Sequence, residues 1–467
     1  MTLPSYPVYK DSGVEWLEEV PEHWAIFSLK RSVDGCTNGL WGEEPDGAND
    51  IAVIRVADFD RSTSRVGLDK LTYRSITQKE RASRLLQSGD LLIEKSGGGE
   101  KTLVGCVVLF EHTFQAITSN FVARMRPLRA FDSGFLCYAF DSLYQGKVNY
   151  PAIKQTTGIQ NLDSESYLQE RFCFPPLAEQ TQIARFLNHE TARIDALIEE
   201  QQRLIELLKE KRQAVILHAV TKGLDPTTPM KDSGVEWLGK VPKHWAIFSL
   251  KRAVDGCTNG LWGDEPDGAN DIAVIRVADF DRSTSRVGLD KLTYRSITQK
   301  ERASRLLEPG DLLIEKSGGG EKTLVGCVVL FEHKFQAITS NFVARMRPLK
   351  EFDSGFLCYA FDSLYQGKVN YPAIKQTTGI QNLDSEAYLQ ERFCFPSLAE
   401  QNQISRFLDC ETARIDGLIE EAQKGVTLLQ ERRSALISAA VTGKIDVRDW
   451  QPPPHTQAPV SAAAEAN

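Results

Sequence analysis

The sequence predicts an α+β protein in which two near-identical α+β domains are separated by two long, antiparallel, coiled-coil-like helices with pseudo-two-fold symmetry. Three observations predict this fold class. The segment KDSGVEWL at 10–17 returns unchanged at 231–238, an offset of 221 residues that fits two copies into a chain of 467. Each copy opens with short β-rich runs between turn residues. Each copy ends in a stretch whose apolar residues recur at alternating steps of four and three.

The first part of each copy predicts a globular α+β domain. Residues 24–175 and 245–396 differ at only eight of 152 positions, so both copies must share one fold. Runs rich in β-branched and aromatic residues, bounded by Gly, Pro, Asp or Ser, predict strands in the first copy. These strands are expected within 50–59, 89–96, 103–110, 115–128 and 170–175, and helices are expected at 75–86 and 132–144.

The second part of each copy predicts a helix of about 40 residues, roughly 60 Å long at 1.5 Å per residue. The expected apolar seam of the first helix runs through Ile183, Leu187, Glu190, Ile194, Leu197, Gln201, Leu204, Leu208, Lys211 and Val215. The second helix has the same register, through Ile404, Leu408, Glu411, Ile415, Leu418, Ala422, Gly425, Leu429, Arg432 and Leu436. Because each seam would otherwise face water, we expect the two helices to pack together.

These patterns divide the chain into five segments. The first domain is expected at 1–176, a central helical spacer at 177–224, the second domain at 225–397 and a distal helical spacer at 398–447. The last segment, 448–467, is rich in Pro and Ala without periodicity and is expected to be a disordered tail.

Composition predicts a cytoplasmic protein without a metal site. No apolar run approaches the roughly 20 residues of a membrane span, and the first residues lack the apolar core of a secretory signal. The nine cysteines form no CxxC pair and lie mostly in apolar runs, which favours small core residues in a reducing compartment over zinc ligands. The net charge of -8 argues against indiscriminate coating of nucleic acid, so any nucleic-acid surface must be local.

The sequence shows little sign of catalysis. The glycine cluster SGGGEKT at 96–102 lacks the glycine that a phosphate-binding loop places directly before its lysine. Asp90 and Glu94 are better interpreted as a turn residue and a strand edge than as metal ligands of a nuclease. The sequence Asn149-Tyr150-Pro151 does not match the motif that a DNA methyltransferase places beside a flipped base. We therefore predict no catalytic and no metal-binding residues in this chain.

Three stretches predict contacts with DNA, and they recur in the second copy. Residues 55–84 carry eight basic and four acidic side chains, a local excess of +4, which is expected of a phosphate-binding surface, although a solvated helix face would show it too. Lys95 and Lys101 flank the glycine cluster, which suits phosphate contacts but also a plain turn. Residues 146–162 offer amides for adenine edges and hydroxyls for phosphates, or else a turn that caps the next element.

The candidate DNA-binding residues of the first copy are Arg55, Arg61, Arg65, Lys70, Arg74, Lys95, Lys101, Lys147, Tyr150, Lys154, Gln155, Thr156, Thr157, Gln160 and Asn161. Those of the second copy are Arg276, Arg282, Arg286, Lys291, Arg295, Lys316, Lys322, Lys368, Tyr371, Lys375, Gln376, Thr377, Thr378, Gln381 and Asn382.

Five stretches together resemble one known family. They are KDSGVEWL followed by VPxHW, then GDLLIEKSGG, TGIQNL, FPPLAEQTQIARFL or FPSLAEQNQISRFL, and ETARIDxLIEE ending in VTKGL or VTGKI. In this order, and present twice between residue 9 and about residue 448, they resemble the DNA-specificity subunit of a Type I restriction-modification enzyme.

The resemblance implies two target-recognition domains, each binding half of a split site on double-stranded DNA. It also implies that the helices dock two methyltransferase subunits and, in a full enzyme, motor-nuclease subunits, for example through exposed arginines such as Arg185, Arg193, Arg406 and Arg414. Catalysis would then lie in those partners, as would S-adenosylmethionine, ATP and magnesium, and this chain would bind no cofactor itself.

This sequence departs from the family pattern because its two domains are nearly the same. We therefore expect a target with two equal halves. If the second helix returns antiparallel along the first, a pseudo-two-fold axis relates the domains, which predicts an inverted repeat with a non-specific spacer and half-site centres on the order of 10 bp apart. Two other functions fit some of the observations: a nuclease-methyltransferase fragment, and a coiled-coil scaffold whose duplicated domains bind protein.

Overall fold

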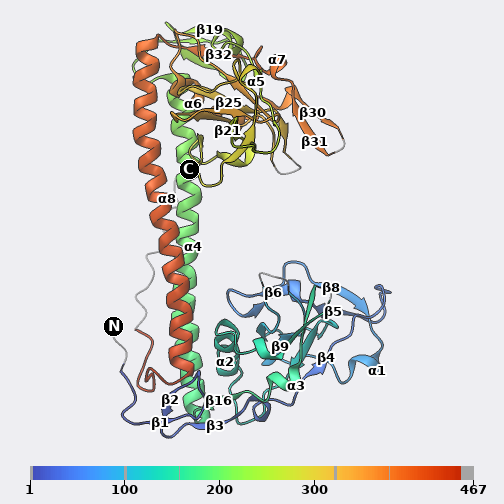
Figure 1. Cartoon of the computed structure of the whole chain (residues 1–467). Coiled ribbons are helices and arrows are strands. Elements are labelled where there is room, and N and C mark those ends of the chain that lie inside the picture. Colours follow the sequence, from blue (N-terminus) through green and yellow to red (C-terminus); the bar gives the residue numbers. More distant parts are fainter. Residues whose placement is uncertain (1–3, 99–101, 157, 320–322, 378, 454–467) are drawn as a thin grey trace. The chain divides into compact units, whose positions relative to one another are not determined.

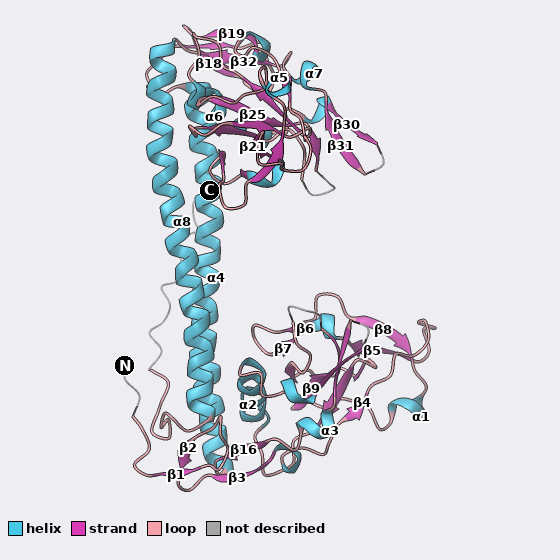
Figure 2. Cartoon of the chain, viewed as in Figure 1, coloured by secondary structure: helices cyan, strands magenta, loops and turns pink. Residues whose placement is uncertain are grey.

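The computed structural model describes residues 4–98, 102–156, 158–319, 323–377 and 379–453 (Figure 1). The chain forms two compact units, Met1–Gln202 with Lys424–Asn467, and Arg203–Gln423. Each unit therefore contains one copy of the repeated domain and half of each long helix. The mixed α+β class predicted from the sequence is confirmed, and Figure 2 shows strands and helices in both domains.

A six-stranded sheet forms the centre of the first domain. Its strand order is β4 (Thr37–Asn38), β13 (Val122–Met125), β9 (Asp90–Glu94), β11 (Val107–Phe110), β7 (Arg65–Val66) and β6 (Phe59–Asp60). Every residue of β9 is buried, because this strand lies between two antiparallel neighbours and is covered on both faces. The interpretation of Asp90 as a turn residue and Glu94 as a strand edge is wrong, because both lie in this central strand and pair with its neighbours. Their charges are paired with Arg126 and Arg61, as burial of a charge requires.

Helix α2 (Ser133–Gln145) covers this sheet. Asp132 caps the helix by accepting a hydrogen bond from the backbone N–H of Phe135. Nine of its residues are buried, among them Phe135 and Phe140, which fits the predicted helix at 132–144. A three-stranded sheet of β12 (Ala116–Thr118), β5 (Asp50–Ile54) and β8 (Thr72–Ser75) completes the domain core.

The predicted helix at 75–86 is mostly wrong. Only α1 (Gln78–Arg81) is helical, because Ser75 is still paired with Asp50 in β8 and Thr77 caps the short turn that follows. The chain then extends again, and the backbone N–H of Leu86 donates to the carbonyl of Ala116.

The base of the first domain joins it to the long helices. Strands β1 (Tyr9–Asp11) and β2 (Glu19–Pro21) pair, as do β3 (Ala25–Ser28) and β16 (Arg171–Phe174). Buried Trp24 donates its indole N–H to Glu179, in the first turn of helix α4 (Leu177–Lys222), at 3.0 Å. A short helix, α3 (Ser164–Tyr167), precedes β16.

The second domain repeats the first, element by element, at the 221-residue offset. Apart from a small three-stranded sheet described below, its strands are β17 (Met230–Asp232), β18 (Lys240–Pro242), β19 (Ala246–Ser249), β20 (Thr258–Asn259), β21 (Asp271–Ile275), β22 (Phe280–Asp281), β23 (Arg286–Val287), β24 (Thr293–Ser296), β25 (Asp311–Glu315), β27 (Val328–Phe331), β28 (Ala337–Thr339), β29 (Val343–Met346) and β32 (Arg392–Phe395). Its helices are α5 (Gln299–Arg302), α6 (Ser354–Gln366) and α7 (Ser385–Tyr388). The second long helix, α8 (Leu398–Val441), follows.

The long helices α4 and α8 run antiparallel within each unit. In the first unit, Ile183 and Leu187 share a core with the last turns of α8, and Asp195 further along α4 pairs with the earlier Arg433 at 2.9 Å. The corresponding ion pair in the second unit joins Arg212 to Asp416 at 2.9 Å. The predicted antiparallel helix pair is therefore confirmed inside each unit.

The predicted seam is right at one of its two heptad positions, and after Ile183 it is wrong at the other. Ile183, Leu187 and Ile194 are buried as expected, but Leu197 and Leu204 are 45% and 43% exposed. The buried position lies one residue later, at Thr191 and Ile205, and Thr412 and Val426 behave in the same way on α8. Within the described residues, no helix is both long and apolar enough to cross a membrane.

Candidate nucleic-acid interface

A small three-stranded sheet brings two of the predicted DNA-contacting stretches together. Strand β10 (Ser96–Gly97), from the glycine cluster, pairs with β15 (Ile159–Leu162), which pairs with β14 (Ile153–Thr156). We call this the hairpin sheet. The stretch 146–162 is therefore largely a β-hairpin where the sequence suggested a loop, and in the second domain the matching strands β30 (Ile374–Thr377) and β31 (Ile380–Leu383) extend from the body of their domain (Figure 1).

The exposed positions of the hairpin sheet are polar and aromatic. Lys154 lies opposite Asn161 in the strand register, and both side chains are exposed. Gln155 is exposed as well, and Tyr150, which begins the turn before β14, is 62% exposed. Lys147 lies nearby in sequence with a positive φ of 57° and is exposed. This arrangement presents cations, amides and an aromatic ring on one small sheet and on the turn that precedes it.

Gln160 is not available for reading bases, because it holds the sheet to the domain. Its side-chain oxygen accepts a hydrogen bond from the buried backbone N–H of Val104 at 3.1 Å, and Asn149 donates to the carbonyl of the same residue at 2.6 Å. The backbone beside this contact leaves no room for a side chain at Gly98. A Cβ at that position would lie 2.7 Å from the carbonyl oxygen of Thr102. Glycine is required there also because its φ is +63°.

The two lysines of this region have different partners. Lys154 pairs with Asp163 at 2.8 Å, and this hydrogen bond raises the pKa of the lysine. An exposed pair of this kind contributes little to stability, so it can exchange for a phosphate contact. Lys95 donates to the side-chain oxygen of Asn38 at 2.7 Å and lines a cavity of about 360 Å³. Burial in this cavity raises the pKa of Cys36.

The basic stretch 55–84 is largely neutralised inside the first domain. Arg61 pairs with the buried Glu94 at 2.7 Å, and Arg65 pairs with Glu111 at 2.7 Å. Arg55 pairs with Asp58 at 2.7 Å, and Lys70 is exposed. Arg74 pairs with Glu44 and lies 4.4 Å above the ring of Trp41. Three acidic residues outside the stretch, Glu44, Glu94 and Glu111, thus offset most of its local charge excess of +4.

The second domain reproduces these contacts. Ser317 pairs with Asn382 in the register of β26 (Ser317–Gly318) and β31, and Lys375 pairs with Asp384 at 3.0 Å. Gln381 accepts from the N–H of Val325 at 3.1 Å. The other predicted positions follow the first domain: Arg276 pairs with Asp279, Arg282 with Glu315, Arg286 with Glu332 and Arg295 with Glu265, while Lys291, Lys368, Tyr371 and Gln376 are exposed.

Four predicted residues, Lys101, Thr157, Lys322 and Thr378, lie outside the described residues, as does 454–467 of the predicted tail. The start of that tail at 448 is wrong, because Trp450 packs against Phe186 of α4. Thr156 and Thr377 end strands β14 and β30.

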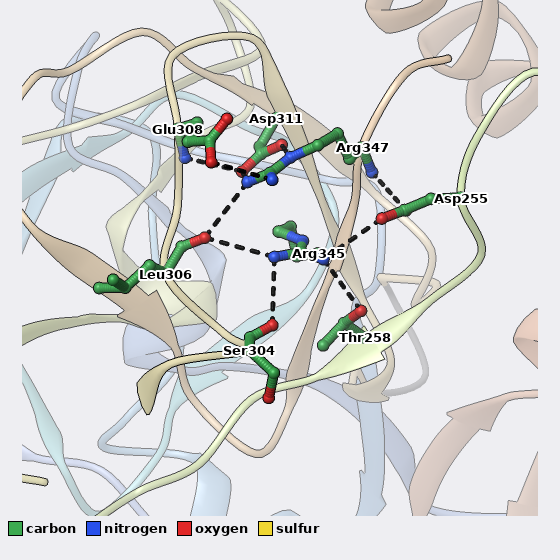
Figure 3. Close-up of polar contacts among 8 residues, drawn as sticks. All are labelled: Asp255, Thr258, Ser304, Leu306, Glu308, Asp311, Arg345 and Arg347. Carbon is green, nitrogen blue, oxygen red and sulfur yellow. Dashed lines mark hydrogen bonds and ion pairs between the residues drawn. The ribbon is translucent and has the colours of Figure 1, made fainter. Parts of the chain in front are cut away.

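Two arginines, the buried Arg345 and the half-buried Arg347, form a polar network in the second domain (Figure 3). Arg345 donates to Asp255 and Thr258, and Arg347 forms two hydrogen bonds with Asp311, at 2.7 and 2.9 Å. Thr258 begins β20, whose next residue, Asn259, accepts a hydrogen bond from Lys316. The network therefore holds the strand that carries Asn259. This residue is the hydrogen-bond partner of Lys316, which the sequence predicted to contact DNA.

The sequence did not reveal Asn38 and Asp163 as partners of the two lysines. The contact between Lys95 and Asn38 spans 57 residues, which no local pattern indicates. Asp163 did carry a signal, because it follows the TGIQNL stretch and caps α3. In the described part of the chain, no group of three or more His, Cys, Asp or Glu side chains is placed to hold a metal ion.

Known proteins with similar sequences share one description. The chain is 22% identical over 373 residues to the Type I restriction enzyme StySPI specificity subunit of Salmonella potsdam, covering 79% of this chain and 77% of the relative. It is 21% identical over 373 residues to the EcoKI specificity subunit of Escherichia coli K12, with the same coverage. The chain is a relative of the Type I restriction enzyme specificity subunits.

The fold of this chain is also similar to the folds of two solved structures. It matches a chain from a structure of the type I R-M system with a TM-score of 0.61 and 16% identity, over 90% of this chain and 98% of that one. The HsdS subunit from Thermoanaerobacter tengcongensis matches with a TM-score of 0.50 and 16% identity, over 91% and 98% of the two chains. No model of a protein family matches the chain.

Proposed function

We propose that this chain is the DNA-binding specificity subunit of a Type I restriction-modification complex and that each domain reads one half of a bipartite site. The observation that carries the proposal is the hairpin sheet, which gathers Lys154, Gln155 and Asn161 from a polar stretch and Ser96 from a distant glycine cluster. The same sheet occurs in both domains with the same register. The similarity to specificity subunits supports this assignment.

Within this proposal, the side chains have separate roles. Lys147 and Lys154 contact phosphates, which positions the protein on DNA without selecting a sequence. Gln155 and Asn161 are exposed on opposite faces of the hairpin, and each offers its amide to a base edge, since amides can pair with adenine through two hydrogen bonds. Gln160 keeps β15 in place through its bond to Val104.

We infer that the two half-sites are equal and form an inverted repeat around a non-specific spacer. Equality is supported by the near-identity of the domains, because all the exposed hairpin residues named above recur in the second copy. Inversion is supported by the antiparallel helix segments within each unit, since two-fold symmetry in a DNA-binding protein is matched by palindromy in its site.

The proposal assigns catalysis to other subunits. The exposed faces of α4 and α8, where Arg185 and Arg406 are exposed, dock two methyltransferase subunits, and a full complex adds motor-nuclease subunits. S-adenosylmethionine, ATP and magnesium belong to those partners.

Selection from a random-sequence DNA pool tests the proposal. The chain is co-expressed with its methyltransferase partner, and bound DNA is recovered at about 0.15 M salt, because affinities depend on ionic strength. Enrichment of an inverted repeat with a fixed spacer is expected. A direct repeat or unequal halves would refute the inversion, and no enrichment at all would favour a scaffold that binds protein.

The duplicated domains supply matched controls for this selection. Gln155→Ala alone should relax one half-site, and Gln376→Ala alone should relax the other by the same amount. Loss of one amide–adenine pair is worth about 1–3 kcal/mol of discrimination, roughly 5- to 150-fold. The double variant should relax both halves, whereas equal relaxation of both halves by a single variant would contradict one domain per half-site.

A further inference from the structure

The two units differ at one face of the long helices. Phe186, in the third turn of α4, is only 2% exposed, whereas its counterpart Phe407 on α8 is 40% exposed. The surrounding residues are similar, because FLNHETARID on α4 corresponds to FLDCETARID on α8. The difference in exposure therefore comes from what covers the face.

In the first unit, the segment after α8 covers this face. The ring of Trp450 packs edge-on against Phe186, with ring centroids 5.2 Å apart and an interplanar angle of 80°, and it also lies 5.2 Å from His189. Gln182 donates its side-chain amide to two backbone carbonyls of the same segment, Val447 at 3.0 Å and Trp450 at 2.6 Å. We call Gln182, Phe186 and His189 the tryptophan seat.

The segment is also held from its other side. The backbone N–H of Asp446 donates to the carbonyl of Pro4 at 2.7 Å, and Arg448 lies 5.0 Å from the ring centroid of Tyr6. Val447 is fully buried. The segment forms a turn, in which the backbone N–H of Trp450 donates to the carbonyl of Val447 at 3.1 Å. A turn with one aromatic side chain and two accepting carbonyls thus fits this helix face well.

The matching seat in the second unit is open. Its residues are Gln403, Phe407 and Cys410, and all three are exposed. After α4 the chain turns, with the backbone N–H of Thr228 donating to the carbonyl of Asp225, and enters β17 at Met230. Among the described residues, Gln403 has no hydrogen-bond partner, whereas Gln182 has two acceptors.

We propose that the open seat of Gln403, Phe407 and Cys410 binds a turn-forming, aromatic-bearing segment of a partner protein. The first unit defines the chemistry of that segment: an indole or phenyl ring against Phe407 and backbone carbonyls that accept from Gln403. A second copy of this chain is a poor source, because each copy has one such segment for two seats, and lending it would open its own. This inference goes beyond DNA recognition and does not depend on it.

A peptide with the sequence of residues 444–453, KIDVRDWQPP, is a direct probe of the seat in the full chain. Cys410 reports binding at the site, because it is the only exposed thiol among the nine cysteines, all of which lie within the described residues. Saturating peptide should slow alkylation of Cys410, followed by mass spectrometry, by at least about fivefold. The peptide carrying Trp450→Ala should not slow it.

The repeat provides the control variants. The chain carrying Phe407→Ala should lose the protection of Cys410, while Phe186→Ala should keep it. Because Phe407 is exposed, its truncation should leave the fold intact, and Gln403→Ala provides a second variant that should weaken protection. No protection, protection that survives Phe407→Ala, or Cys410 reactivity that falls as the chain is concentrated without peptide would each overturn the proposal.

Discussion

The ion pair between Arg61 and Glu94 predicts that an arginine in the basic stretch stabilises the fold rather than the DNA complex. Glu94 is 1% exposed and Arg61 is 33% exposed, with 2.7 Å between their charged atoms. Substituting Arg61→Met leaves the carboxylate buried without its cation. Removing one partner of a fully buried pair costs about 3–5 kcal/mol. Since Arg61 is one-third open to water, we expect a loss of about 2 kcal/mol.

Thermal unfolding followed by circular dichroism measures this loss. For a unit of this size, about 2 kcal/mol corresponds to a decrease in Tm of roughly 4–8 °C. The effect should also depend on pH. Burial raises the pKa of Glu94 in the folded state, and loss of Arg61 raises it further. A carboxyl whose folded pKa is raised destabilises the protein as pH rises through that pKa, so the loss should be smaller near about pH 4 than near about pH 7.

The matched variant Arg282→Met removes the same contact, with Glu315, from the second domain and should have the same effect. Neither variant should change how DNA affinity depends on salt. If Arg61→Met left the Tm unchanged and reduced the salt slope by about one, the arginine would be a phosphate contact and the structural argument would be wrong.

Four further substitutions test the helix seam and the hairpin sheet. Lys154→Met should leave unfolding unchanged, because the pair with Asp163 is exposed, but should weaken DNA binding for all sequences and lower the salt slope by about one in mobility-shift titrations; an unchanged slope would place the phosphate contact elsewhere. Ile205→Ala should cost about 2–4 kcal/mol in denaturant unfolding, whereas Leu197→Ala, at an exposed position, should cost less than about 0.5 kcal/mol; equal costs would restore the seam predicted from sequence. Gly98→Ala should lower stability by at least about 1 kcal/mol, and hydrogen exchange in β15 should rise; an unchanged exchange rate would show that the close contact relaxes freely.

The sequence predicted the fold well where one pattern had one solution. The repeat, the helix at 132–144, a strand within 89–96 and the two long helices all appear. The seam failed at one position because Leu197-Ile198 and Leu204-Ile205 are adjacent apolar pairs, so the spacing fits two registers. Only packing against α8 decides between them.

The candidate site was predicted less completely, because its pairing is long-range. The excess of basic residues in 55–84 could be counted, but Arg61 finds Glu94 33 residues away and Arg65 finds Glu111 46 residues away. Such partners are fixed by sheet topology, which a local count does not contain. Gln160 was expected to contact DNA, yet its side chain is committed to Val104 inside the domain.

The pairing of β3 with β16 has a consequence for how the chain folds. The two strands that pair in the first domain have the same sequences as β19 and β32, which pair in the second. During refolding from denaturant, β3 can therefore meet either β16 or β32. The longer loop disfavours the wrong partner by only about 0.8 kcal/mol, roughly fourfold, since loop-closure entropy grows slowly with length. Synthesis on the ribosome removes the choice, because the first domain can close before β32 has been made.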